Sequence, residues 1–138
     1  MTAPTRRFAA ATLFAALVCA GPAQARDTAL LPPCDHPSAL QEIANRFAEN
    51  EWKFWNSSLQ IVQFWRIREL AFRPWAVHTI PRRFCTGHVI VSDGVKRRVN
   101  YSIIEHAGII GATWGVEWCV VGLDRNLAYN PACRAALP

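Results

Sequence analysis

The stretch that decides the fold is RFCTGHVIVSDGVKRRVNYSIIE, residues 83–105. Two strand-like runs flank Asp93-Gly94, a pair that is typical of hairpin turns. A bare two-residue turn would place valines opposite charged residues. A type I turn with a bulge at Gly94 instead places Val91 opposite Val95 and gathers the apolar residues on one face, so we predict the bulged turn. The predicted buried face contains Val89, Val91, Val95, Val99, Tyr101 and Ile103.

The opposite face of this hairpin carries polar side chains suited to acid–base chemistry. His88 is expected opposite Arg98, and Asn100 is expected beside Glu117 of the last strand. A histidine, a carboxylate and an arginine within reach of one another would serve a small hydrolase or isomerase. The alternative is that this is the solvent face of a half-covered sheet. The candidate catalytic residues are His88, Glu117 and Arg98, with Thr86 and Asn100 beside them.

A helix is predicted before the hairpin. Ser38 is a good N-cap, and Gln41 completes a capping box with it. Apolar residues then recur at helical spacing over residues 39 to about 51, which predicts one buried helix face. Asn56-Ser57-Ser58 predicts a break after the helix. The predicted buried stripe contains Leu40, Ile43, Ala44, Phe47 and Glu51.

Residues 59–73 are predicted to form a strand. They are rich in β-branched and aromatic side chains, and their apolar residues recur with a period of two. A helix over residues 59–71 would also bury several of these side chains, so it remains the alternative. The strand prediction places Leu59, Ile61, Trp65 and Ile67 on one face and Arg66 and Arg68 on the other.

A last strand is predicted over residues 112–122, with Tyr101 opposite Val116. The order of elements predicts an α+β fold, in which one amino-terminal helix packs on a curved antiparallel sheet of about four strands. This arrangement resembles the cystatin-like fold and the fold of nuclear transport factor 2, a likeness that implies nothing about activity. The residues predicted to alternate onto the core are Ala112, Trp114, Val116, Trp118 and Val120.

Four cysteines lie beyond the first 25 residues, and an even number in an exported domain implies two disulfides. Three connectivities are possible. We favour Cys119–Cys133, because the turn at Asn130-Pro131 would bring the tail back, and Cys34–Cys85 then follows.

A zinc site is the alternative use of these cysteines. Cys85 is near His88, and Cys34 is near His36 in the sequence. Zinc sites normally combine two close pairs of ligands, and the other two cysteines are not close to each other in the sequence. We therefore expect neither a metal nor another cofactor.

The first 25 residues have the three parts of a secretory signal. Arg6-Arg7 supplies positive charge, residues 8–20 are almost entirely apolar, and Ala23-Gln24-Ala25 resembles a cleavage site. The apolar run is shorter than the about 20 residues that a spanning helix needs, so no permanent membrane span is expected. We predict cleavage near Ala25 and a single globular domain over residues 26–138, located in the periplasm or secreted.

The net charge is mild. The whole chain carries a formal charge of +5, and two of its arginines lie in the predicted leader. Such a balance does not indicate a nucleic-acid-binding protein.

The six tryptophans fall into two groups. Trp65, Trp114 and Trp118 follow the core pattern. The other three lie in less regular stretches beside Lys53 and Arg73, where aromatic rings and cations can bind sugars, peptidoglycan fragments or a partner protein. The alternative is that they cover the open end of the sheet. These candidate ligand-binding residues are Trp52, Trp55 and Trp75.

Three stretches resemble a group of uncharacterised bacterial proteins with signal peptides. They are Ile80–Cys85, Val91–Gly94 and Trp114–Arg125, and the likeness spans most of residues 34–133. The resemblance implies export and a shared fold, and no particular chemistry.

The function expected from the sequence is that of a non-enzymatic binding or accessory protein of the cell envelope. It would hold a protein or small-molecule partner on the outer sheet face or in a cleft between helix and sheet. The alternatives are a small hydrolase or isomerase that uses His88 and Glu117, and a structural component of the envelope.

Overall fold

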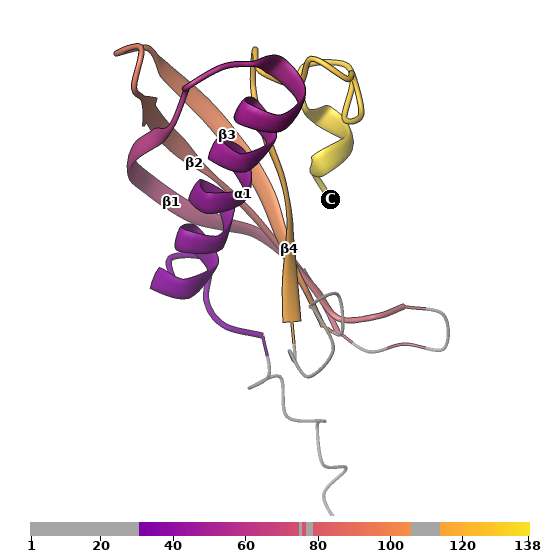
Figure 1. Ribbon diagram of the computed structural model, residues 1–138. Helices are drawn as coiled ribbons and strands as arrows, with labels where there is room; N and C mark the ends of the chain where they lie inside the picture. The colour runs from indigo at the N-terminus through magenta and orange to yellow at the C-terminus, as the bar shows by residue number, and fades with distance from the viewer. Residues whose placement is uncertain (1–30, 75, 77–78, 106–113) are drawn as a thin grey trace, which may run out of the picture.

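The computed structural model describes residues 31–74, 76, 79–105 and 114–138. One helix packs on a four-stranded antiparallel sheet with strand order β1-β2-β3-β4, and this confirms the predicted fold class (Figure 1). No helix in these ranges is both long and apolar enough to cross a bilayer. The elements are α1 (Pro37–Trp55), β1 (Ile61–Arg73), β2 (Arg82–Val91), β3 (Lys96–Glu105), β4 (Trp114–Val120) and the short 3-10 helix η2 (Arg134–Ala136).

The hairpin of β2 and β3 has the predicted register, with Gly87 opposite Val99. Gly94 has φ 79°, and its N–H donates to the Val91 carbonyl at 2.8 Å, as the bulged turn requires. The prediction was wrong for Val95, which is 48% exposed because it lies on the turn, beyond the edge of the core. The other predicted core residues, Val89, Val91, Val99, Tyr101 and Ile103, are fully buried.

Helix α1 begins two residues earlier than predicted, at Pro37 instead of residue 39. His36 is the N-cap, and its Nδ1 accepts a hydrogen bond from the backbone N–H of Ser38 at 3.3 Å. Pro37 occupies the first turn, where its missing N–H costs nothing. The predicted capping box does not form, because Gln41 donates to Asn45 instead. The buried residues of the helix are Ala39, Ile43, Phe47 and Glu51.

The segment predicted to be a strand forms β1, but the alternation of its side chains between the two faces of the sheet is interrupted. One extra residue in β1 between Ile61 and Gln63 reverses which side chains face the core, and a second between Trp65 and Arg68, where Arg66 has φ 51°, reverses them again. The prediction was wrong for Trp65, which lies opposite His88 on the outer face, while Phe64 packs against the core.

Gly87, on β2, makes room for the bulge of β1 at Arg66. A Cβ at this position would lie 3.2 Å from Cγ1 of Ile67 and 3.4 Å from the carbonyl oxygen of Trp65. The glycine therefore lets the bulged part of β1 approach β2 closely.

The register of β3 and β4 differs from the prediction by two residues. Tyr101 lies opposite Trp118, not Val116, so Asn100 lies opposite Cys119 and not beside Glu117. The predicted faces are nevertheless correct, because a shift of two residues preserves the alternation. Val116 and Val120 are buried, and Trp114 and Trp118 pack against the same core.

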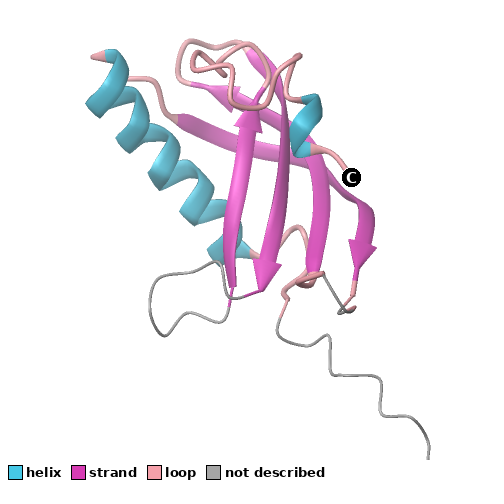
Figure 2. Cartoon of the chain, turned by 90° about the vertical axis from the view of Figure 1, so that its right-hand side faces the viewer, coloured by secondary structure: helices cyan, strands magenta, loops and turns pink. Residues whose placement is uncertain are grey.

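Different elements cover the two faces of the sheet. Helix α1 lies across one face, and η2 and the tail lie beside the other (Figure 2). The tail is fixed by the Cys119–Cys133 disulfide and by a 3.3 Å hydrogen bond from Nδ2 of Asn100 to the Cys133 carbonyl. We call the face opposite α1 the outer face.

Both predicted disulfides are present. Cys34–Cys85 joins the segment before α1 to β2, with Cα atoms 5.8 Å apart, and Cys119–Cys133 joins β4 to the tail, with Cα atoms 5.7 Å apart. The thiolates that a zinc site would need are therefore occupied. Residues 1–25, Trp75 and Ala112, on which other predictions rest, lie outside the described residues.

Candidate functional site

The structure brings His88 and Arg98 together and leaves Glu117 apart. His88 lies opposite Arg98, whereas Glu117 lies opposite Ser102, four residues further along β3. At ordinary strand spacings this separates the backbones of His88 and Glu117 by about 13 Å along the strands and about 10 Å across them. The Glu117 carboxylate pairs with Arg82 at 3.1 Å. The two side chains are not within hydrogen-bonding reach, and a catalytic role for them stays a prediction.

His88 is held by packing. Its ring lies 5.4 Å from that of Trp65, and its Nδ1 is buried without a hydrogen-bond partner among the described residues. Catalytic histidines are usually oriented by a carboxylate or a carbonyl. Next to it, the Thr86 hydroxyl and Oδ1 of Asn100 are 2.8 Å apart and satisfy each other.

The candidate tryptophans occupy different surroundings. Trp52 is 71% exposed and does not line the groove described below. Trp55, one turn further along the same helix, does line it.

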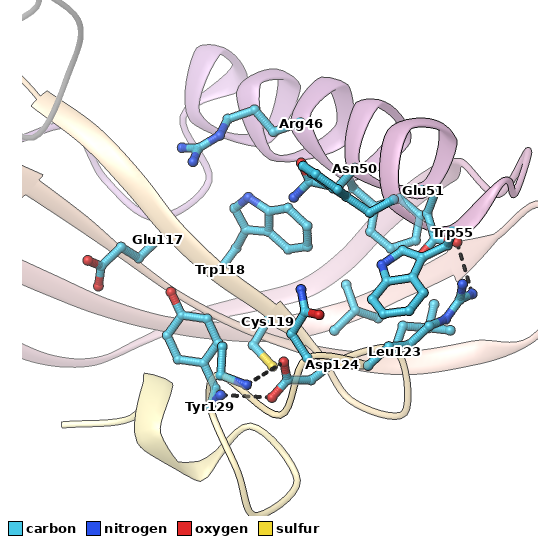
Figure 3. Close-up of a pocket in the computed structure, with 16 residues that line it drawn as sticks. Arg46, Asn50, Glu51, Trp55, Glu117, Trp118, Cys119, Leu123, Asp124 and Tyr129 are labelled. Atoms are coloured by element: carbon cyan, nitrogen blue, oxygen red, sulfur yellow. Dashed lines mark hydrogen bonds and ion pairs between the residues drawn. The ribbon is translucent and has the colours of Figure 1, made fainter.

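A groove of about 210 Å³ lies between α1, β4 and the carboxyl-terminal loop, residues 121–133. Figure 3 shows Arg46, Asn50 and Trp55 on the helix side, Trp118 on β4, and Tyr129 and Asp124 on the loop side. The groove therefore combines aromatic rings with polar and charged groups that come from three separate parts of the chain.

Asp124 gives the loop its shape. Its carboxylate accepts hydrogen bonds from the backbone N–H groups of Ala128 at 3.1 Å and Tyr129 at 2.8 Å (Figure 3). Gly122, with φ 87°, turns the chain out of β4 and into the loop. Together with the Cys119–Cys133 disulfide, these contacts hold the loop side of the groove in place.

An ion pair between a buried carboxylate and a partly exposed arginine closes one end of the groove. Glu51 is only 3% exposed, and its carboxylate lies 2.9 Å from Nη2 of Arg125. The guanidinium of Arg125 also lies 5.3 Å from the ring centroid of Trp55. Because Arg125 contacts both residues, it joins the loop to the carboxyl-terminal end of α1.

A second arginine lies on the helix side. Nη1 of Arg46 donates to the Val116 carbonyl at 2.9 Å, and so satisfies an acceptor on the free edge of β4. The same nitrogen is 3.6 Å from Glu42. These contacts hold the Arg46 side chain across the strand edge, where it lines the groove.

Three polar side chains in the groove have no side-chain hydrogen bond within the described part of the chain. They are Asn50, Asn126 and Tyr129. Burial, and then the negative charge of Glu117, raises the pKa of the Tyr129 hydroxyl above its ordinary value. Tyr129 therefore remains protonated at neutral pH, and the groove offers two amides and a hydroxyl to a ligand.

The acidic groups of the groove are already engaged. Glu51 pairs with Arg125, Glu117 pairs with Arg82, and Asp124 accepts two backbone N–H groups. Ligand atoms of Cys119, Asp124 and Cys133 lie within 4.8 Å of one another, but both sulfur atoms belong to a disulfide. This cluster is therefore not a metal site, because a disulfide sulfur is not a thiolate.

Sequence reasoning identified Trp55 and Glu117 as candidates and missed Asn50, Asp124 and Tyr129. The one local signal was Asp124, because an aspartate at the start of a loop commonly accepts backbone N–H groups. Nothing local could reveal the groove itself, because its walls meet only when α1 packs beside β4. Comparison of the chain with protein families, with curated proteins and with solved structures gave no match.

Proposed function

We propose that this is an exported, non-enzymatic binding protein whose groove holds one small polar ring, such as a single unit of a cell-envelope sugar. The observation that carries the proposal is the convergence of Trp55, Trp118 and Tyr129 with the free amides of Asn50 and Asn126. Aromatic rings offer apolar contact area to a sugar ring, and amides and hydroxyls bond its hydroxyl groups.

The size of the groove supports a small ligand. Pockets for drug-sized ligands occupy about 300–1,000 Å³. The groove, at about 210 Å³, is smaller than that range. It suits one ring of a longer molecule, with the remainder lying in solvent.

The state of the carboxylates supports binding over catalysis. A general acid or base must be free to exchange a proton with the substrate. Each acidic side chain that lines the groove in the described part of the chain already has a cation or two backbone N–H groups as its partner.

Export is the second part of the proposal. It rests on the signal-like first 25 residues, with cleavage near Ala25, and on the likeness to exported bacterial proteins. Two disulfides are compatible with it, because disulfides persist in oxidising compartments such as the periplasm. Mass spectrometry of protein from the natural host would give the mature amino terminus.

Two tryptophans of α1 provide a matched experiment. We would titrate the protein with a panel of envelope sugars and their oligomers, by calorimetry and by amide chemical shifts. Trp55→Ala should weaken binding at least about fivefold, as expected for an aromatic residue that contacts a ligand. Trp52→Ala removes the same side chain from the same helix outside the groove, and should leave the affinity unchanged.

The amides of Asn50 and Tyr129 should shift when a sugar binds. If no sugar in the panel shifts them, or if both tryptophan variants lose affinity equally, the groove is not the binding site and the proposal fails.

A further inference from the structure

Most cations in the described part of the chain either have an acidic partner or lie on the outer face. Six of the twelve described lysines and arginines form ion pairs: Arg46, Lys53, Arg82, Arg83, Arg97 and Arg125. The other six are exposed and pair with no described acidic side chain: Arg66, Arg68, Arg73, Lys96, Arg98 and Arg134.

Strand register places four of these unpaired cations on the outer face. Arg68 lies opposite Thr86, and Arg73 lies opposite Arg82, which places both on the outer side of β1. Arg98 lies opposite His88, and Lys96 is two residues before it on β3. Two rows of cations thus run along β1 and β3, on either side of β2 and about 10 Å apart.

The surface between the two rows, which is the outer face of β2, is mostly uncharged. Along β2 it contains the buried side chains of Phe84 and Thr86, and His88, whose ring lies against that of Trp65. The guanidinium groups of Arg73 and Arg82 lie over the Phe84 ring, 5.1 and 5.7 Å from its centroid. Glu117 is on the same face, but its charge is balanced by Arg82. By contrast, the exposed charges of α1 form i,i+4 pairs, Arg46 with Glu42 and Lys53 with Glu49.

The tail restricts what can reach this face. It is fixed over β3 and β4 by the Cys119–Cys133 disulfide and the Asn100–Cys133 hydrogen bond, and η2 lies beside the sheet in Figure 2. A planar bilayer would meet the tail before it met the sheet. A narrow flexible chain can lie along the strands beside the tail.

We infer that the outer face of β1, β2 and β3 binds a flexible linear polyanion that carries phosphate groups, between the arginines of β1 and the cations of β3. Charge complementarity carries this inference. Three of the four cations are arginines, whose planar guanidinium groups can form two hydrogen bonds to one phosphate. None of these four cations lines the groove, so the inference does not depend on a ligand there.

The test uses the full mature protein and inorganic polyphosphate of defined length, with affinity measured by anisotropy of a labelled chain. Arg68→Glu and Arg98→Glu should each weaken binding at least about fivefold at low salt and reduce the salt dependence. Lys53→Glu makes the same change in net charge on α1, and should alter the affinity less than about twofold. Both arginines are exposed, so circular dichroism should be unchanged in all three variants.

Two results would overturn the inference. An equal loss in Lys53→Glu would mean that net charge attracts the polymer to the whole protein. Binding to anionic phospholipid vesicles without binding to polyphosphate would mean that the face recognises a bilayer. Trp55→Ala should leave polyphosphate binding unchanged, which separates this result from the outcome for the groove.

Discussion

Tyr101 is the largest of the fully buried side chains and has a specific polar role. Its hydroxyl donates to the Cys34 carbonyl at 2.5 Å, and so joins β3 to the segment before α1, close to the Cys34–Cys85 disulfide. Burial raises the pKa of this hydroxyl well above its ordinary value, so the group stays a donor over the working pH range.

We predict that Tyr101→Phe lowers the free energy of unfolding by about 1–3 kcal/mol. The change leaves a buried carbonyl without its donor, and an unsatisfied buried group costs this amount. Urea denaturation would measure it. Tyr129→Phe is the matched control, since that hydroxyl has no described hydrogen bond, and it should cost less than about 0.5 kcal/mol. Equal costs in the two variants would mean that the bond to Cys34 contributes nothing.

At the scale of the elements, an ion pair between Asp93 and Arg97 stabilises the turn between β2 and β3. The Asp93 carboxylate accepts from the Val95 N–H at 2.9 Å and pairs with Arg97 at 2.6 Å. The hydrogen bond from Arg97 is the main cause of the low pKa of Asp93, which is about 2 rather than 3.8. Since folding lowers this pKa, the ionised carboxylate stabilises the folded state.

This contribution should depend on pH in the acid range. It is complete above pH 3.8 and is lost as the pH falls from there towards about 2, where the carboxylate of the folded protein becomes protonated. Asp93→Asn removes the titration. The wild-type protein should therefore be more stable than the variant at pH 5, and the difference should shrink by pH 2. A difference that stays constant across this range would refute the assignment.

The elements also show what sequence patterns can predict. The hairpin register followed from the valine alternation and from the chemistry of Asp93-Gly94, both of which are local. The bulge at Arg66 could not be predicted, because nothing in the local sequence indicates that this arginine has a positive φ. Gly87, which allows the bulged part of β1 to come close, lies on another strand. The groove likewise depends on contacts between distant segments, and of its lining residues only Trp55 and Glu117 were candidate site residues from the sequence.

At the scale of the whole molecule, the two disulfides should have separate effects. They span 51 and 14 residues, and the loop-entropy model gives stabilisations of about 4 and 3 kcal/mol respectively. Cys34–Cys85 stabilises the core, where Cys85 is fully buried. Cys119–Cys133 instead fixes the tail and, through it, one wall of the groove.

We predict that replacing Cys119 and Cys133 with alanine loosens the tail without unfolding the sheet. Trypsin should then cleave after Arg125 much faster than in the wild-type protein, while cleavage after Arg98, within β3, should stay slow. Mass spectrometry of the timed digest gives both rates from one sample. If both rates rose in parallel, this disulfide would stabilise the whole fold and not the tail alone.

The interruptions in β1 have a consequence for contacts between molecules. An exposed edge strand can recruit the strand of another copy and so begin an ordered aggregate. In β1 the regular pairing is broken at three places, and no uninterrupted run exceeds three residues. The backbone donors and acceptors of a second molecule that paired with this edge would therefore fall out of phase with those of β1 after a few residues. The interruptions, one of which turns Trp65 outward, thus also disfavour the growth of fibres from this edge.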